Sequence, residues 1–232
     1  MASFENDDLS FKIGFILFPN LTLLDFAGPY EVFSRIPEAK VFLIAKDIGP
    51  IANKGGLTLI ANDNFKTAPQ LDLICVPGGM GILAASADEE TLAFLRVQAI
   101  KAKWITSVCT GSLILGAAGL LSGYHAVTHW SSMDILPLVG AIPVDERIVK
   151  DRNRITGGGV TSGIDFGLYV VGEIFGSELA EAIQLMMEYN PKPPYKSGHP
   201  SEAPPAILER VRYLGHAEHQ RRLDFFSNLK LR

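Results

Sequence analysis

The stretch Trp104-Ile105-Thr106-Ser107-Val108-Cys109-Thr110-Gly111-Ser112-Leu113 holds the pattern from which the fold of this chain can be predicted. A short apolar run ends at Cys109, and a helical run of small residues begins at once. This pattern is typical of a strand that turns sharply into a helix with a nucleophile at the tip of the turn. The helix amides and dipole would then favour the thiolate, the reactive form of cysteine. The alternative is a buried apolar cysteine at a strand end.

Strands and helices alternate along the chain on both sides of this turn. Buried strands are predicted at 12–18, 41–45, 71–76 and 104–108, with shorter ones near 126–128 and 149–155 and a hairpin-like stretch around Gly55-Gly56. Helices are predicted at 21–33, 89–101, 110–118, 163–175, 179–189 and 206–228. This order predicts an α/β fold, a three-layer α/β/α sandwich of the flavodoxin-like type with a mostly parallel central sheet.

The length and composition fit a single domain over residues 1–232. The chain has 232 residues, of which 47% are hydrophobic, and no linker-like stretch divides it. We expect residues 1–11 to be a flexible N-terminus and residues 190–232 to form a proline-rich surface crossing followed by the last helix. The expected inward positions of that helix are Ile207, Val211, Leu214 and Phe225.

Charge and hydropathy disfavour several classes of protein. The net charge of −4 argues against a nucleic-acid partner, because such proteins carry a basic face. The apolar runs are far shorter than the ~20 residues that cross a membrane, and Met1 to Ser10 does not resemble a secretory signal. Two cysteines provide no metal framework, and Cys75 lies in an apolar strand. We therefore expect a cytoplasmic protein with no metal and no cofactor.

Four chemically informative positions each follow a predicted strand. They are Asp25, the pair Gly78-Gly79, Cys109 and Gly158. In open α/β sheets ligands bind at the carboxyl ends of the strands, where the strand order reverses. One site could therefore collect all four.

Asp25 is unusual because apolar residues flank it on both sides, and burying an unpaired charge is costly. It could be a proton partner for the thiol or the N-cap of the helix that follows. His129 could serve Cys109 as a base, or could be a partly buried structural histidine. His216 and His219 lie on a charged helix and are interpreted as a solvated face rather than as metal ligands.

The segment from Gly78 to Ala84 contains the pattern G-x-G-x-x-A after a strand. This pattern is similar to a dinucleotide fingerprint, but it follows a later strand than the fingerprint normally does. A glycine-rich turn whose N–H groups cradle developing negative charge is the preferred interpretation over NAD binding.

Several of these motifs together resemble the DJ-one/PfpI superfamily, with its class I glutamine-amidotransferase-like fold, over residues 12 to 190. The matching segments are Leu24 to Pro29 with Glu31-Val32-Phe33, then Val76 to Gly79, Ser107 to Ser112, and Thr128-His129-Trp130. Within the superfamily the chain is most similar to the isocyanide hydratases. Their aspartate is matched by Asp25, the threonine after their cysteine by Thr110, and a glycine-bearing turn near the thiol by the region of Gly158.

The resemblance implies a mechanism and a set of site residues. Thiolate Cys109 would add to the terminal carbon of an isocyanide to give a covalent thioimidate, with Asp25 delivering a proton. Water would then attack the same carbon, and loss of the thiol would leave an N-substituted formamide. Backbone groups of Gly79 and Thr110 would position substrate or water, and the Thr110 hydroxyl would hold Asp25 or the thiol. Phe26 and Trp130 would line an apolar pocket, and a homodimer is implied.

Two other groups of relatives keep alternatives open. AraC-type regulators carry a similar domain, so the chain could be a binding module that senses a small ligand without turnover. Glyoxalase-like, amidase and protease-like members are a third hypothesis. Asp25 in place of glutamate, and Thr110 in place of a histidine directly after the cysteine, argue against these members.

Overall fold

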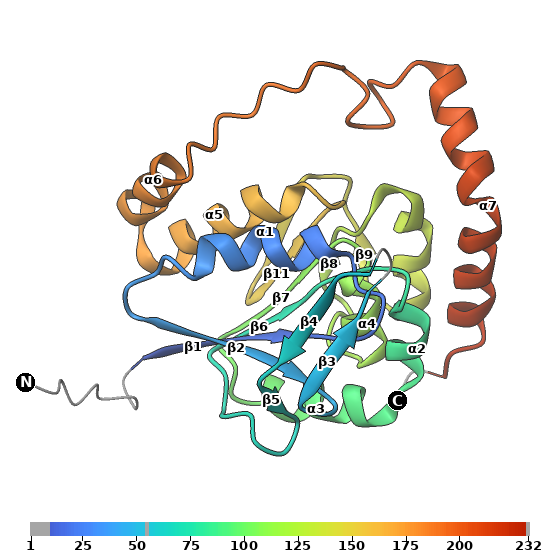
Figure 1. Ribbon diagram of the computed structural model, residues 1–232. Coiled ribbons are helices and arrows are strands. Elements are labelled where there is room, and N and C mark those ends of the chain that lie inside the picture. The colour runs from blue at the N-terminus through green and yellow to red at the C-terminus, as the bar shows by residue number, and fades with distance from the viewer. Residues whose placement is uncertain (1–9, 54–55, 231–232) are drawn as a thin grey trace, which may run out of the picture.

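A seven-stranded sheet lies at the centre of the molecule in the computed structural model, which describes residues 10–53 and 56–230 (Figure 1). The strand order is β10-β11-β7-β6-β1-β2-β5, and all neighbours are parallel except β10 and β11. These strands are β1 (Phe11–Ile16), β2 (Ala39–Ala45), β5 (Asp63–Asn64), β6 (Leu73–Val76), β7 (Trp104–Val108), β10 (Ile148–Asp151) and β11 (Arg154–Gly157). The predicted α/β fold with a mostly parallel sheet is confirmed.

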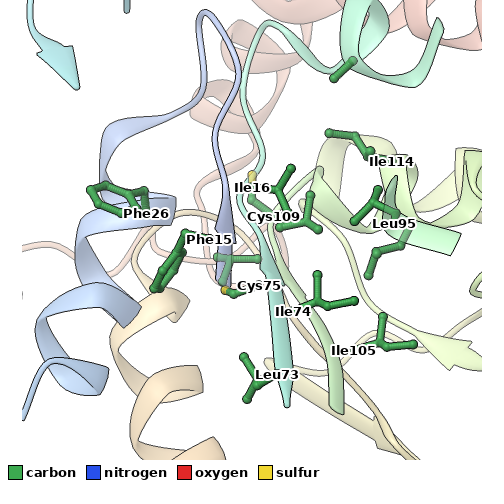
Figure 2. Packing of buried hydrophobic residues seen from close by; sticks show 14 of the residues in the cluster. Phe15, Ile16, Phe26, Leu73, Ile74, Cys75, Leu95, Ile105, Cys109 and Ile114 are labelled. Carbon is green, nitrogen blue, oxygen red and sulfur yellow. The ribbon is translucent and has the colours of Figure 1, made fainter. Parts of the chain in front are cut away.

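Helices cover both faces of the sheet (Figure 1). One layer contains α1 (Leu23–Phe33), α5 (Ser162–Phe175) and α6 (Ser177–Met186), and the other contains α2 (Ile82–Ala87), α3 (Glu89–Ala99) and α4 (Gly111–Ala117). The central strands read as continuous apolar runs because both of their faces are buried; every residue of β6 is buried. In Figure 2, Phe15 and Phe26 pack on one side of the strands and Leu95 and Ile114 on the other.

Smaller elements flank this sandwich. Two short two-stranded sheets pair β3 (Gly49–Ala52) with β4 (Thr58–Ala61) and β8 (His125–Ala126) with β9 (Ile142–Pro143). The β3–β4 pair corresponds to the predicted hairpin-like stretch, although residues 54–55 lie outside the described part. A 3-10 helix, η1 (Trp130–Val139), and the short helix α2 were not predicted. Among the described residues, no helix is both long and apolar enough to cross a membrane.

The last helix, α7 (Pro205–Ser227), stands at one side of the molecule after a long crossing that arches away from the body (Figure 1). The predicted inward positions Ile207, Val211 and Leu214 are wrong, since their side chains are 46%, 45% and 72% exposed. Within the described part of α7, the buried residues are Arg222 and Phe226, and the predicted Phe225 is half-buried against the core. At the other end of the chain, Phe11 already belongs to β1, so the predicted flexible N-terminus extends too far; residues 1–9 lie outside the described part.

Candidate active site

Cys109 occupies the tight turn between β7 and α4. Its φ is 57°, in the left-handed region that residues other than glycine rarely adopt. Its N–H donates to the carbonyls of Gly157 and Gly158 at 2.9 Å each. Its carbonyl accepts from the hydroxyls of Thr128 and Ser112 at 3.0 and 3.2 Å. These bonds hold the backbone in a strained conformation and fix the direction of the cysteine side chain.

Asp25 lies in the first turn of α1 and is fully buried. Thr22 is the N-cap residue of this helix, so the alternative that Asp25 caps it is wrong. The Oδ2 atom of Asp25 accepts a hydrogen bond from the Gly78 N–H at 3.1 Å. The Cys109 thiol donates toward the same carboxyl, while Oδ1 has no partner of ordinary geometry within the described part of the chain. The carboxyl therefore faces the nucleophile rather than its own helix.

Burial controls the acidity of this pair. It raises the pKa of Asp25 from its ordinary 3.8 to about 7, against the lowering effect of the hydrogen bonds from Cys109 and Gly78. Burial and the charge of Asp25 raise the pKa of Cys109, which the N–H groups of Val160 and Thr110 lower in part. The predicted lowering of the Cys109 pKa is therefore wrong, because this residue is only 5% exposed and lies beside a carboxyl. The direction of this shift favours the thiol over the thiolate at neutral pH, and Asp25, whose pKa lies near 7, is placed to exchange a proton with it.

Thr110 joins the turn after β6 to the turn after β7. Its Oγ1 accepts from the Gly79 N–H at 3.0 Å. The hydroxyl therefore acts on the Gly79 backbone, not on Asp25 or the thiol as the sequence suggested. A Cβ on Gly78 would lie 2.5 Å from Thr110 N and 2.9 Å from the Asp25 carboxylate. Glycine at this position lets the three segments meet.

The glycine-rich turn after β6 uses its N–H groups within the chain. Those of Gly78 and Gly79 bind the two side chains described above, and that of Gly81 donates to the Asn20 carbonyl at 3.2 Å. Gly79 has a φ of 144°, and a Cβ there would lie 2.5 Å from Thr22 N. Neither the dinucleotide fingerprint nor the anion cradle fits this turn, because the N–H groups of its three glycines are occupied within the chain and Gly79 packs against the β1–α1 loop.

A cavity of about 750 Å³ opens over Cys109. Gly79 and Thr110 also line it, and its far side is formed by η1 and α7. The apolar part of the lining comes from Met80, Trp130, Met133, Val160, Val211 and Leu214. The cavity is large enough for a small organic molecule with a bulky apolar group.

The remaining predicted pocket residues divide into two groups. Trp130 lines the cavity. Phe26 does not, because its ring packs in the core against Phe15 and Tyr30, with centroids 5.2 and 5.1 Å away. Gly158 holds the Cys109 backbone through its carbonyl instead of contacting the cavity.

Val160 was missed by the sequence analysis. Its N–H faces the Cys109 sulfur, and it lines the cavity. The glycine run before it marks the turn, but a contact made by a backbone N–H leaves no trace in the type of side chain.

Three histidines line the cavity. His129 Nδ1 accepts from the Ser131 N–H at 3.3 Å, and burial together with the charge of Arg222 lowers its pKa to about 4, so the ring is neutral at neutral pH. His216 and His219 were interpreted as part of a solvated face. His216 is indeed exposed and His219 is half-buried, and both border the cavity. No group of three or more potential metal-binding side chains occurs among residues 10–53 and 56–230.

Comparison with known proteins agrees with this geometry. The model of the DJ-1/PfpI family matches residues 11–173. The isonitrile hydratase of Pseudomonas putida is 49% identical over 204 residues, which cover 88% of this chain and 90% of that protein. The HTH-type transcriptional regulator GbdR of Pseudomonas aeruginosa is 31% identical over 77% of this chain, a match that spans 50% of the regulator.

Solved structures extend the likeness to the whole fold. A ThiJ/PfpI family protein from Pseudomonas syringae superposes with a TM-score of 0.92 at 41% identity and covers 97% of both chains. Oxidized DJ-1 from Toxoplasma gondii shares the fold with a TM-score of 0.71 at 21% identity, over 78% of this chain and all of that one. The turn at Cys109, the carboxyl beside it and these matches lead to one conclusion: this chain belongs to the DJ-1/PfpI family.

Proposed function

We propose that this protein is an isocyanide hydratase, which adds water to an organic isocyanide and releases an N-substituted formamide. The observation that carries the proposal is the buried pair of Asp25 and Cys109, in which Cys109 lines a largely apolar cavity and Asp25 lies directly behind it. The reaction needs a nucleophile and a movable proton at the same carbon atom, and this pair provides both. The 49% identity to the isonitrile hydratase of Pseudomonas putida supports the same conclusion.

In the first half of the reaction the thiol adds across the terminal carbon of the isocyanide. Asp25, whose pKa lies near 7, accepts the Cys109 proton and passes it to that carbon. The sulfur forms the C–S bond, and the product is a thioimidate, R–N=CH–S–Cys109. The N–H groups of Val160 and Thr110 stabilise the negative charge that develops on the sulfur before the bond forms.

In the second half water completes the formamide. Asp25, again a carboxylate, removes a proton from water while the water oxygen attacks the thioimidate carbon. Asp25 then passes this proton to the nitrogen. The C–S bond then breaks, the hydroxyl proton returns to the Cys109 sulfur through Asp25, and R–NH–CHO leaves. The sum is one isocyanide plus one water, so the scheme as balanced calls for no external oxidant or reductant.

The direct test is incubation of the purified protein with cyclohexyl isocyanide and detection of N-cyclohexylformamide by mass spectrometry. We expect formamide from the wild type and none from Cys109→Ser, which keeps the size of the side chain but replaces a good nucleophile with a poor one. Wild-type protein that binds the isocyanide without forming formamide would favour the ligand-sensing alternative suggested by the regulator-type relatives.

We also propose that the protein works as a homodimer. Large apolar side chains are exposed on α6 and α7 outside the cavity, among them Leu185, Met186 and Tyr213 at 81%, 64% and 83%. A second copy that covers them would remove this apolar area from water. Light scattering at micromolar concentration should give twice the chain mass; a monomer would contradict the proposal.

We also propose a cytoplasmic location. The two cysteines are unpaired, which is consistent with a reducing compartment.

A further inference from the structure

Gly215 lies in the interior of α7. Glycine destabilises a helix interior relative to alanine, because it loses more backbone freedom on folding and contributes no side chain. A glycine at this place therefore needs a reason in either the backbone or the packing.

Neither the backbone nor the packing supplies that reason. Gly215 is absent from the positive-φ residues of the described chain, so alanine could adopt its conformation. A Cβ built on Gly215 would have no heavy atom of the described residues within 4 Å. By contrast, a Cβ on Gly78 in the active site would come within 2.5 Å of Thr110. Gly215 is exposed, and the space next to it is open.

The open space belongs to the cavity that contains Cys109. Gly215 lines this cavity together with Val211, Glu218 and Arg222. These residues lie four before, three after and seven after Gly215, so they share one face of the helix. That face forms the wall of the cavity contributed by α7, while Cys109 and Thr110 line the part next to the sheet. A side chain at position 215 would therefore extend into the volume that a ligand on Cys109 would use.

We propose that Gly215 is a specificity-determining residue, whose missing side chain leaves room for a bulky apolar N-substituent on the isocyanide. The inference rests on the proposed function. Apolar surface predominates in the cavity, to which Leu214, Val211 and Met133 contribute beside charged side chains of α7, so the substituent is apolar. A cavity of about 750 Å³ exceeds what the smallest isocyanides would fill and lies within the roughly 300–1,000 Å³ of sites for larger organic ligands.

The test compares a small and a bulky isocyanide on variants of α7. Gly215→Leu places a side chain in the cavity, and leucine favours the helix, so the variant should fold. Ala217→Leu is the matched control, since Ala217 is exposed on the same helix and is not part of the cavity lining. The substrates are methyl isocyanide and 2-naphthyl isocyanide, with the formamide as the readout.

We expect Gly215→Leu to lower kcat/KM for the naphthyl compound roughly 10–200-fold and for methyl isocyanide less than about threefold, as crowding of an apolar pocket does. Ala217→Leu should change neither. An equal loss for both isocyanides, with a shift in oligomeric state, would show that a second copy occupies the space and would overturn the inference. Unchanged kinetics for both compounds would also overturn it.

Failure of the proposed function gives a different result. If wild-type protein hydrates neither isocyanide, that function is wrong, and the inference is judged by calorimetric binding of N-(2-naphthyl)formamide. Binding that the wild type shows and Gly215→Leu loses supports the role of Gly215. Binding that the variant retains, or that the wild type lacks, overturns it.

Discussion

Replacing Asp25 with asparagine removes a buried carboxyl while keeping an oxygen that can accept the Gly78 N–H. Burial raises the pKa of Asp25 from 3.8 to about 7. The folded protein therefore binds this proton more tightly than the unfolded chain does. Stability contributed by the protonated group is present at low pH and is lost as the pH rises through this interval.

The size of the effect follows from the shift in pKa. Each pKa unit corresponds to 1.36 kcal/mol, so ionising Asp25 in the folded state costs about 4 kcal/mol at pH values above 7. Asparagine avoids this cost. We expect Asp25→Asn to raise the free energy of unfolding at about pH 8 by up to ~4 kcal/mol over the wild type. The difference should shrink as the pH falls and approach zero only below about pH 3, where the wild-type carboxyl is protonated in both the folded and the unfolded state.

The same variant should lose activity. Asparagine cannot exchange a proton, and general acid–base catalysis is typically worth roughly 10²–10⁴-fold, so formamide production should fall at least that far. A variant that gains stability at high pH and also loses activity would identify Asp25 as a buried group that transfers a proton.

The assay combines urea denaturation at several pH values with formamide production. Asp47→Asn, which removes an exposed carboxyl, is the control. Near-normal turnover by folded Asp25→Asn would refute the catalytic role. A stability difference that does not depend on pH would refute the argument from burial.

Other outcomes follow from the same geometry. Gly78→Ala places a Cβ 2.5 Å from Thr110 N, so it should destabilise the fold by about 1–3 kcal/mol and lower turnover by displacing the turn, as thermal unfolding and kinetics would detect. Iodoacetamide should label Cys109 before Cys75, because Cys109 lines the cavity whereas Cys75 is fully buried in β6; peptide mass spectrometry checks the order. The labelling rate should keep rising above about pH 8, because the thiolate is the reactive form and burial raises the pKa of Cys109; a rate that levels off below pH 7 would contradict that shift.

The sheet and the nucleophile turn were predictable because their signals are local. Strand β7 was predicted with its observed bounds, Trp104–Val108. A short apolar run that is followed at once by a helical run of small residues is typical of a buried strand before a helix. The convergence of Asp25 and Cys109 was also predictable, because parallel strands bring their carboxyl ends to one edge.

The acidity of Cys109 and the role of α7 were not predictable, because both depend on tertiary packing. The amides next to Cys109 favour a thiolate locally, but burial beside Asp25 outweighs them. The spacing of Ile207, Val211 and Leu214 suggests a helix face in the core, yet the crossing before α7 carries the helix to the edge of the molecule.

The left-handed backbone at Cys109 has a consequence for how the sequences of relatives change over time. A residue with a Cβ pays roughly 1–2 kcal/mol in this conformation, which glycine adopts freely. The most stable sequence for this turn therefore lacks the nucleophile, and only selection for chemistry keeps a cysteine there. In relatives that no longer catalyse a reaction, drift toward glycine or asparagine at this position should be favoured. The residue at the tip of the turn would then separate catalytic members from those that only bind a ligand.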